Sequence, residues 1–247
     1  MELFYVPEGS VAASVRSLMI EGDEFHHLSR VLRKKEGEHI RVTDGSGLSL
    51  EVLITSVGKR SLEGEILARS VVERPATGVT VAISLLKAPA RFDFFLEKAT
   101  ELGVSGVIPM MTQRTVSQPP RERFKGRMER WRNIMLSAAR QSGRFHLPVL
   151  HEPLSFREAL GLKGYDLRLI PYEGSGVVPE LDFPGKKVLF LIGGEGGFTP
   201  GEVEAASETG FREMSFGRSI LRAESAGIFA VALVRTRLLA GPPSEWL

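Results

Sequence analysis

Short stretches of alternating apolar and polar residues dominate the first seventy positions of the chain. They are rich in β-branched residues and repeat with a period of about two, which is typical of strands with one buried face. The predicted strands are Leu3–Val6, His39–Thr43, Leu48–Val57 and Leu62–Ala68. Asp44-Gly45-Ser46-Gly47 predicts a hairpin turn between two of them. One short helix, from Asp23 as its N-cap to about Leu32, interrupts the strands. The pattern indicates a small β-barrel.

The rhythm changes after Arg74-Pro75-Ala76-Thr77-Gly78, a polar segment with proline and glycine that predicts a domain boundary. Residues 1–73 would form the barrel and residues 74–247 a second domain. There, apolar runs alternate with helical patterns, which predicts an α/β domain with a largely parallel sheet. The predicted strands are Val79–Leu86, Val104–Met110, Leu167–Ile170, Lys187–Ile192 and Phe211–Ser215. The predicted helices are Arg91–Leu102, Arg121–Ser142, Phe156–Leu160, Pro200–Thr209 and Glu224–Ala240.

Two helix starts carry a specific signal. Ser155 with Glu158, and Thr199 with Glu202, have the three-residue spacing of a capping box. Gly103 follows the last apolar position of Arg91–Leu102 and is expected to end that helix.

Composition excludes several classes of protein. The hydrophobic fraction of 43% and the net charge of +2 exclude general disorder. The chain has no cysteine, which excludes disulfides, thiolate nucleophiles and cysteine-ligated metals. The N-terminus lacks the features of a signal peptide, and the longest apolar stretch, Ala226–Val234, is too short to span a bilayer. We therefore expect a soluble, cytoplasmic protein.

The small net charge hides an uneven distribution. Between Arg114 and His146, eight arginines and one lysine face two glutamates, a local net charge of 9 − 2 = +7, so the remainder carries 2 − 7 = −5. This segment, the basic strip, could contact nucleic acid or could be a solvated helix face. Phe124 and Trp131 within it could stack on a base or belong to the core. His26 and His27 are adjacent, but no further residue has ligand spacing, so we predict no metal site.

A glycine-rich loop, Gly193-Gly194-Glu195-Gly196-Gly197, follows a predicted strand and precedes the Thr199 capping box. Ligands bind at such strand ends in open α/β sheets. The loop matches neither the dinucleotide fingerprint nor the P-loop. Its glutamate would repel phosphates, so a neutral or cationic ligand suits it better. A sharp β–α turn without a ligand is the alternative.

A second segment, Phe216 to Ala226, leads into the apolar C-terminal helix. Arg222 and Glu224 lie where that helix starts. Such a pair is either a helix-terminal ion pair or part of a site, and the spacing leaves both open.

Together the glycine loop and the run Gly217 through Ile220-Leu221-Arg222-Ala223-Glu224-Ser225-Ala226 resemble the paired C-terminal motifs of SPOUT-class RNA methyltransferases. The match is to the ribosomal RNA small subunit methyltransferase E family, which forms N3-methyluridine in 16S rRNA. Further segments agree and occur in the expected order along nearly the whole chain: His27-Leu28, Val31-Leu32-Arg33, Lys87, Lys98 to Val104, Arg114, and Gln141-Ser142-Gly143-Arg144.

The chain departs from the family pattern at several positions. The family usually has proline at Gly194, threonine at Ala223 and Ser225, arginine at Ser219, and glutamate at Gln113 and Arg140. Ser219 and Ala223 matter most, because each loses polar capacity beside the expected site.

The resemblance implies a PUA-like β-barrel followed by a trefoil-knotted α/β methyltransferase domain that works as a homodimer. It implies S-adenosylmethionine as the cofactor, held by three loops. The residues carried over for the cofactor are Tyr172, Gly193, Gly194, Glu195, Gly196, Phe216, Gly217, Ile220, Leu221 and Ala226. The cofactor has no phosphate and carries a sulfonium cation, which agrees with the ligand class expected from the glycine loop.

The reaction implied is methylation of N3 of uridine 1498 in 16S rRNA, within the 30S subunit. We expect Arg222, or secondly Arg114, to stabilise negative charge on the uracil carbonyls. Glu224 would orient Arg222 or take the N3 proton. The expected RNA contacts are His27, Arg33, Lys87, Arg114, Arg140 and Arg144.

Two alternatives remain at this point. A methyltransferase of the same fold could act on another rRNA or tRNA base. A non-catalytic RNA-binding or ribosome-assembly protein could retain the fold, and it would bind RNA without binding a methyl donor.

Overall fold

The computed structural model describes residues 3–7, 9–11, 15–115 and 124–241. The chain divides into two compact units. The barrel unit comprises the residues up to Arg74 and, from later in the sequence, Ala139–Leu147. The α/β unit comprises Pro75–Ala138 and Pro148–Leu247. The predicted division into residues 1–73 and 74–247 placed residues 139–147 in the second domain, whereas they group with the barrel unit.

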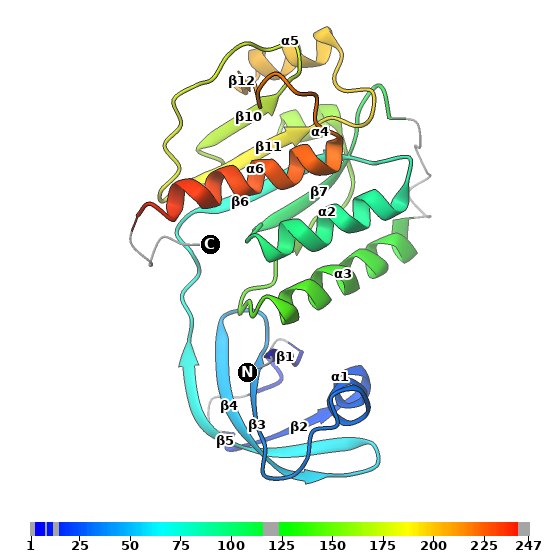
Figure 1. Cartoon of the computed structure of the whole chain (residues 1–247), viewed down its shortest axis with the longest axis vertical. Helices are drawn as coiled ribbons and strands as arrows, with labels where there is room; N and C mark the ends of the chain where they lie inside the picture. Colours follow the sequence, from blue (N-terminus) through cyan, green and yellow to red (C-terminus); the bar gives the residue numbers. More distant parts are fainter. Residues whose placement is uncertain (1–2, 8, 12–14, 116–123, 242–247) are drawn as a thin grey trace. The chain divides into compact units, whose positions relative to one another are not determined.

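The barrel unit is built on a bent five-stranded sheet in the order β1-β3-β4-β5-β2 (Figure 1). Neighbouring strands are antiparallel except for the parallel pair β1 and β3. The strands are β1 (Leu3–Tyr5), β2 (Ser17–Glu21), β3 (His39–Thr43), β4 (Leu48–Val57) and β5 (Ser61–Val71). β3 and β4 have the predicted bounds, and β2 was not predicted. The buried residues Ile20, Val42 and Leu62 form part of one apolar core under the sheet.

The turn between β3 and β4 confirms the hairpin prediction. The Asp44 carboxylate accepts hydrogen bonds from the backbone N–H of Ser46 at 2.9 Å and from its hydroxyl at 2.8 Å. Gly45 and Gly47 have φ angles of 80° and 111°, which residues with a side chain rarely adopt. An aspartate followed by glycines therefore suits this turn, because the carboxylate accepts local hydrogen bonds and the glycines adopt positive φ angles.

The predicted helix near Asp23 is present as two joined pieces, α1 (Gly22–His26) and the π-helical η1 (His27–Val31). Asp23 as the N-cap was wrong, because the N-cap is Glu21 and its side chain caps nothing. Phe25 and Leu28 are buried in the barrel core, so burial of these side chains fixes the segment rather than a strong cap.

The α/β unit contains a seven-stranded sheet in the order β12-β10-β11-β6-β7-β8, with β9 also paired to β7. All of these pairings are parallel, as the alternating pattern predicted. The strands are β6 (Gly78–Ser84), β7 (Gly106–Met111), β8 (Val149–Leu150), β9 (Leu154–Ser155), β10 (Leu167–Pro171), β11 (Lys187–Ile192) and β12 (Arg212–Met214). The two-residue strands β8 and β9 are too short to show a period and were not predicted.

Helices cover both faces of this sheet (Figure 1). They are α2 (Pro89–Glu101), α3 (Phe124–Gln141), α4 (Phe156–Leu160), α5 (Pro200–Glu208) and α6 (Ala223–Leu238). Along β11, Phe190 faces the core shared with α2, α3 and α6, whereas Leu189 and Leu191 face the core shared with α4 and α5. This alternation explains why the central strands are apolar throughout.

In the α/β unit, the three predicted helix caps are confirmed. Both capping boxes are complete at Ser155 and Thr199, with reciprocal bonds to Glu158 and Glu202. Gly103 follows α2 with a φ of 103°. Trp131 of α3 is buried, with its ring centroid 4.5 Å from that of Phe92, and Phe124 is buried as well. Both aromatic residues therefore belong to the core.

Candidate functional site

Three loops meet at one edge of the α/β sheet because the strands before them are neighbours and parallel. β10 ends at Pro171, β11 at Ile192 and β12 at Met214, and the sheet order places β10 between the other two. Their carboxyl ends therefore point the same way, and the following loops gather where ligands bind in open α/β sheets.

A cavity of about 80 Å³ opens between the loops that follow β10 and β12. Its lining consists of Pro171, Tyr172, Glu173, Phe216, Gly217, Arg218, Ser219, Ile220, Leu221 and Ala226. Six residues predicted for the cofactor are among them. The volume is well below the roughly 300 Å³ of typical small-molecule pockets. Ile220, in the segment from Phe216 to Leu221, is exposed at this cavity.

The glycine loop turns tightly next to this cavity and explains its glycines. The N–H of Gly197 donates to the carbonyl of Gly194 at 3.0 Å. Gly197 has a φ of +64°, and a Cβ there would lie 2.6 Å from Oε1 of Glu173. Glu173 belongs to the loop after β10, so the two loops are in contact. The other predicted cofactor residues, Gly193, Gly194, Glu195 and Gly196, lie in this turn and do not line the cavity.

Arg114 holds the outer side of the glycine loop. Its Nη1 donates to the carbonyl of Gly196 at 2.7 Å and to that of Phe198 at 3.4 Å. The turn that carries Arg114 is itself fixed by hydroxyl groups: Thr112 N–H donates to Oγ1 of Thr115, and Ser84 Oγ lies 2.8 Å from the same oxygen. The hydroxyl contacts of Thr115 therefore fix the turn that carries Arg114, and the Arg114 guanidinium donates to the glycine loop.

Charged residues from four segments converge beside the glycine loop. The Lys87 N–H donates to Oε1 of Glu195 at 3.0 Å. Nη1 of Arg91 lies 4.0 Å from Oε1 of Glu195, and its Nε lies 3.8 Å from Oε1 of Glu224. Glu224 is buried, and its Oε2 has no hydrogen-bond partner among the described residues. An unpartnered buried carboxylate oxygen is costly and requires an explanation.

Arg222 is the N-cap residue of α6, and its side chain is exposed. Its carbonyl accepts the N–H of Ala226 at 2.8 Å. In the described part of the chain, Glu224 forms its ion pair with Arg91, so the structure does not contain the pair between Arg222 and Glu224 that their spacing left open.

Comparison with known proteins identifies the family. A family model of the RNA methyltransferase domain matches residues 73–235, and a model of the RNA methyltransferase PUA domain matches residues 20–67. A ribosomal RNA small subunit methyltransferase E from Synechocystis is 31% identical over 96% of this chain and 77% of that protein. The Bacillus subtilis protein of the same name is 29% identical over 90% of this chain and 91% of that protein.

This chain belongs to the ribosomal RNA small subunit methyltransferase E family.

Solved structures extend the likeness to three dimensions. The family member from Neisseria gonorrhoeae, solved with S-adenosylmethionine bound, has a TM-score of 0.84 and 30% identity over 96% of this chain and 98% of that chain. A protein from Legionella pneumophila, solved with the same cofactor, also has a TM-score of 0.84, with 26% identity over 95% of this chain and 97% of that chain. The predicted α/β methyltransferase fold with a PUA-like domain is thereby confirmed.

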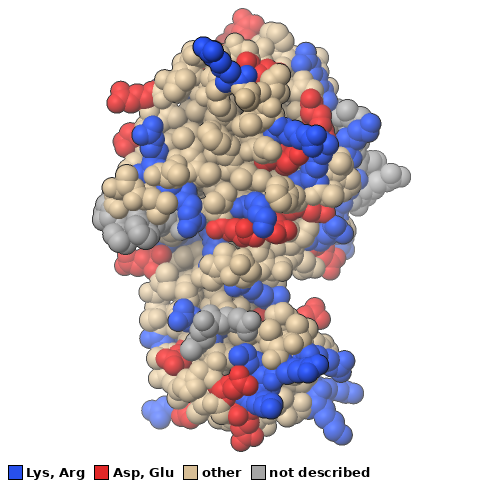
Figure 2. Space-filling model, in the orientation of Figure 1, with Lys and Arg blue, Asp and Glu red and all other residues tan. Residues whose placement is uncertain are grey.

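The residues predicted to contact RNA fall into both units. His27 and Arg33 lie in and directly after η1 of the barrel unit, where Figure 2 shows a gathering of basic side chains. Arg33 has a φ of 53°, a left-handed conformation that is rare outside glycine. Lys87 and Arg114 lie in the α/β unit beside the glycine loop.

The remaining two predicted contacts, Arg140 and Arg144, belong to the barrel unit. The guanidinium of Arg140 pairs with the buried carboxylate of Glu24, and the carbonyl of Arg144 accepts the hydroxyl of Tyr5. The Glu24 carboxylate also accepts the N–H of Tyr5 at 2.8 Å. Burial raises the pKa of Glu24, although the backbone N–H of Tyr5 and the charge of Arg140 act in the opposite direction.

Much of the basic strip is engaged in ion pairs. Besides the pair of Arg140, Arg130 pairs with Asp93 at 2.6 Å, and Arg132 lies 3.8 Å from Glu152. Arg121, Glu122 and Arg123 lie outside the described residues. The +7 total therefore overstates the charge that the strip offers to a partner.

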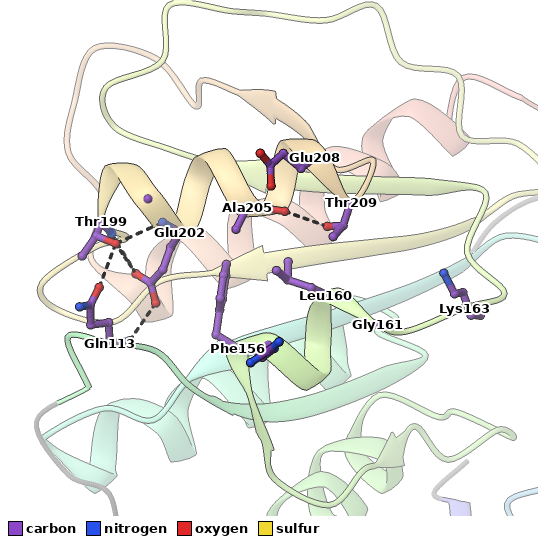
Figure 3. A pocket seen from close by; sticks show the side chains of 12 residues that line it. Gln113, Phe156, Leu160, Gly161, Lys163, Thr199, Glu202, Ala205, Glu208 and Thr209 are labelled. Carbon is purple, nitrogen blue, oxygen red and sulfur yellow. Dashed lines mark hydrogen bonds between the residues drawn. The ribbon is translucent and has the colours of Figure 1, made fainter.

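Sequence reasoning missed Arg91, Glu173 and a second cavity. No motif marks Arg91 or Glu173, because their partners are distant in sequence. The second cavity, of about 840 Å³, lies between α4 and α5 (Figure 3). Phe156 and Leu160 lie on its α4 side, and at one end Thr199 donates to the Gln113 amide oxygen at 3.2 Å. The two capping boxes marked the helices that enclose it, but nothing in the sequence marked the space.

Two kinds of site are absent from the described residues. No three His, Asp or Glu side chains there are grouped closely enough to hold a metal ion. No helix in the same ranges has the length and apolar character needed to cross a membrane.

Proposed function

We propose that this protein transfers a methyl group from S-adenosylmethionine to N3 of uridine 1498 in 16S rRNA, acting on the 30S subunit in the cytoplasm. The observation that carries the proposal is the cavity between the loops after β10 and β12, in a family with a member solved with this cofactor bound. Members named for the small-subunit rRNA supply the substrate class.

The residues at the cavity suit this cofactor. Backbone groups of Phe216 to Leu221, with apolar Ile220 and Leu221, suit an adenosine group that carries no phosphate. The carboxylate of Glu173 lines the same cavity and favours a cationic ligand. Tyr172, Gly193, Gly194, Glu195, Gly196, Phe216, Gly217, Ile220, Leu221 and Ala226 are the proposed cofactor residues. When bound, the cofactor supplies an electrophilic methyl group on a sulfonium.

Three charged side chains near the loops have proposed roles in proton removal and charge stabilisation. N3 of uracil must lose its proton as it forms the bond to carbon, and Glu224 Oε2 is an unpartnered acceptor beside the α6 start. Arg222, exposed at that start, stabilises negative charge on a uracil carbonyl oxygen. Arg114 is second in this role, because its guanidinium is engaged with the glycine loop.

The RNA contacts in the proposal are His27, Arg33, Lys87, Arg114 and Arg144. Arg140 acts less directly, because its guanidinium is committed to Glu24. A base must be unpaired or flipped out before its N3 can be reached.

The proposal includes the homodimer and the trefoil knot that the family resemblance implies. Ile220 is 84% exposed and Phe229 is 42% exposed, so apolar surface remains at the start of α6 for a second copy to cover. Sedimentation of the protein as a monomer at micromolar concentration would contradict the homodimer. An experimental structure whose backbone is not knotted would contradict the trefoil knot.

Methylation of 30S subunits, free 16S rRNA and tRNA in parallel, with a labelled methyl donor and mapping of the product nucleoside, tests the proposal. We expect N3-methyluridine at position 1498 and 30S subunits as the best substrate. Methylation of another base would favour a different member of the fold class. RNA binding without calorimetric binding of S-adenosylmethionine at millimolar concentration would favour a non-catalytic protein.

Arg222→Ala separates chemistry from binding. We expect turnover at saturating cofactor to fall by about 10²–10³-fold, the range for loss of one charge-stabilising donor, with cofactor affinity unchanged. Turnover near that of the wild type would remove Arg222 from the chemistry.

A further inference from the structure

Arg91 occupies a position that local preferences disfavour. It is the third residue of α2, a helix with no acidic residue in its first turn. The N-terminus of a helix carries a partial positive charge, so a guanidinium there is repelled unless other groups compensate. A local rule broken in this way is a common mark of a functional position.

Compensation comes from two carboxylates on two other elements. Glu195 belongs to the glycine loop and Glu224 to the first turn of α6, and both approach Arg91 within 4.0 Å. The guanidinium presents Nη1 to one and Nε to the other. Without it, two carboxylates from different elements would face each other with no cation between them.

Glu195 is also fixed on its other side, because its Oε1 accepts the N–H of Lys87. The loop between β6 and α2 and the first turn of α2 therefore hold the glycine loop through one carboxylate. Glu224 presents Oε1 toward Arg91, while its Oε2 has no hydrogen-bond partner among the described residues.

We infer that Arg91 is a positioning residue that couples the glycine loop to the acceptor carboxylate of Glu224. It holds Glu195 in place for the cofactor and turns Oε1 of Glu224 toward itself, which leaves the buried Oε2 without a partner among the described residues. This inference rests on the proposed function, and it assigns to Arg91 the partnership that sequence spacing suggested for Arg222.

The test is a set of four variants in the full-length protein: Arg91→Gln, Arg91→Lys, Glu224→Gln and the double variant Arg91→Gln/Glu224→Gln. For Arg91→Gln we expect the KM for S-adenosylmethionine to rise about fivefold and kcat to fall about tenfold, as for loss of one charged contact near a site. Arg91→Lys keeps the charge and should recover kcat to within about threefold of the wild type.

Non-additivity distinguishes coupling from a merely structural role. At saturating S-adenosylmethionine, where the effect through Glu195 on cofactor binding no longer limits the rate, Arg91→Gln in the Glu224→Gln background should cause no further fall in single-turnover rate, because the acceptor that Arg91 positions is already lost. The same loss in both backgrounds, or wild-type kcat for Arg91→Gln, would overturn the inference. Arg130→Gln is the matched control, since it breaks an arginine–carboxylate pair on α2 and α3 and should leave the cofactor dissociation constant unchanged.

Wild-type measurements separate the two proposals. A wild-type protein that does not bind S-adenosylmethionine by calorimetry overturns the proposed function and the inference with it. A wild-type protein that binds and methylates while the variants behave additively overturns only the inference.

Discussion

Glu24 in the barrel unit and Glu224 in the α/β unit are both buried, but their carboxylates differ in how they are partnered. Glu24 in the barrel unit is 8% exposed, and its oxygens accept the Tyr5 N–H and pair with Arg140. Glu224 in the α/β unit is 7% exposed, has only a 3.8 Å contact with Arg91, and keeps one oxygen unpartnered. Burial alone therefore does not distinguish a structural glutamate from one that can accept a ligand proton. The number of hydrogen-bond and ion-pair partners of its carboxylate is the difference between the two.

The difference follows from what each carboxylate connects. Glu24 joins β1, α1 and the returning segment 139–147 within one unit, so a partner for each of its two oxygens favours a fixed structure. Glu224 lies in the first turn of α6, and in the proposed function its unpartnered oxygen accepts the N3 proton. The following experiments test this distinction, from the largest expected effect on stability to the smallest.

Arg140→Ala should have the largest effect. It leaves Glu24 buried without its cation, and loss of one partner of a buried pair costs about 3–5 kcal/mol of unfolding free energy. Urea unfolding followed by circular dichroism measures it. Arg132→Ala removes an exposed pair with Glu152 and should change nothing measurable. Equal effects of the two variants would show that the Glu24 pair is not a structural anchor.

Gly197→Ala should cost less and act on the site. Its φ of +64° and a Cβ position 2.6 Å from Glu173 Oε1 predict a loss of about 1–2 kcal/mol from the backbone alone. Cofactor affinity should fall at least about tenfold, since the glycine loop must change its backbone conformation and the Glu173 side chain, which lines the cavity, must shift.

Gly201→Ala is the control for that glycine. A Cβ at Gly201, in the first turn of α5, meets nothing within 4 Å, so the change should stabilise by at most about 1 kcal/mol. Thermal midpoints and calorimetric titration with S-adenosylmethionine measure both variants. If the two behave alike, the tight turn at Gly197 is not required.

The pH dependence of stability provides a smaller test of Glu24. Its folded-state pKa is raised above the ordinary 4.5, so the folded state holds the proton more tightly than the unfolded chain. This contribution is complete below pH 4.5 and is lost as the pH rises through the raised value. The unfolding free energy of the wild type minus that of Glu24→Gln should therefore decrease from pH 4 to 7. A difference that increases over this range would contradict the raised pKa.

Glu224→Gln should have the smallest effect on stability, within about 0.5 kcal/mol, because an isosteric amide replaces a poorly partnered carboxylate. Turnover should nevertheless fall by at least about 10²-fold if Oε2 accepts the N3 proton. Unfolding in urea and methylation of 30S subunits measure the two quantities on the same protein. A large loss of stability with unchanged turnover would place Glu224 with Glu24 as a structural residue.

Local patterns in the sequence predicted most of the strands and helices and their order along the chain. The period of two in His39–Thr43 and Leu48–Val57 predicted β3 and β4 to the residue, and the Ser155 and Thr199 capping boxes predicted two helix starts. These signals succeed because they depend on neighbours within a few positions. β8 and β9 were missed because two residues cannot show a period. β2 was missed although its five residues alternate between exposed and buried positions.

Contacts between distant positions were decided only by the tertiary structure. Arg140 and Glu24 are separated by 116 residues, and Arg114 and Gly196 by 82. The sequence presented Arg140 as one more charge in a basic strip, and it left open whether Arg222 and Glu224 form a helix-terminal ion pair or part of a site. Folding gives Arg140 to Glu24 and Glu224 to Arg91, because strand order and helix packing choose ion-pair partners by proximity in space. Sequence motifs therefore predicted the segments of the candidate site, whereas the tertiary structure determines which charged side chains lie next to one another there.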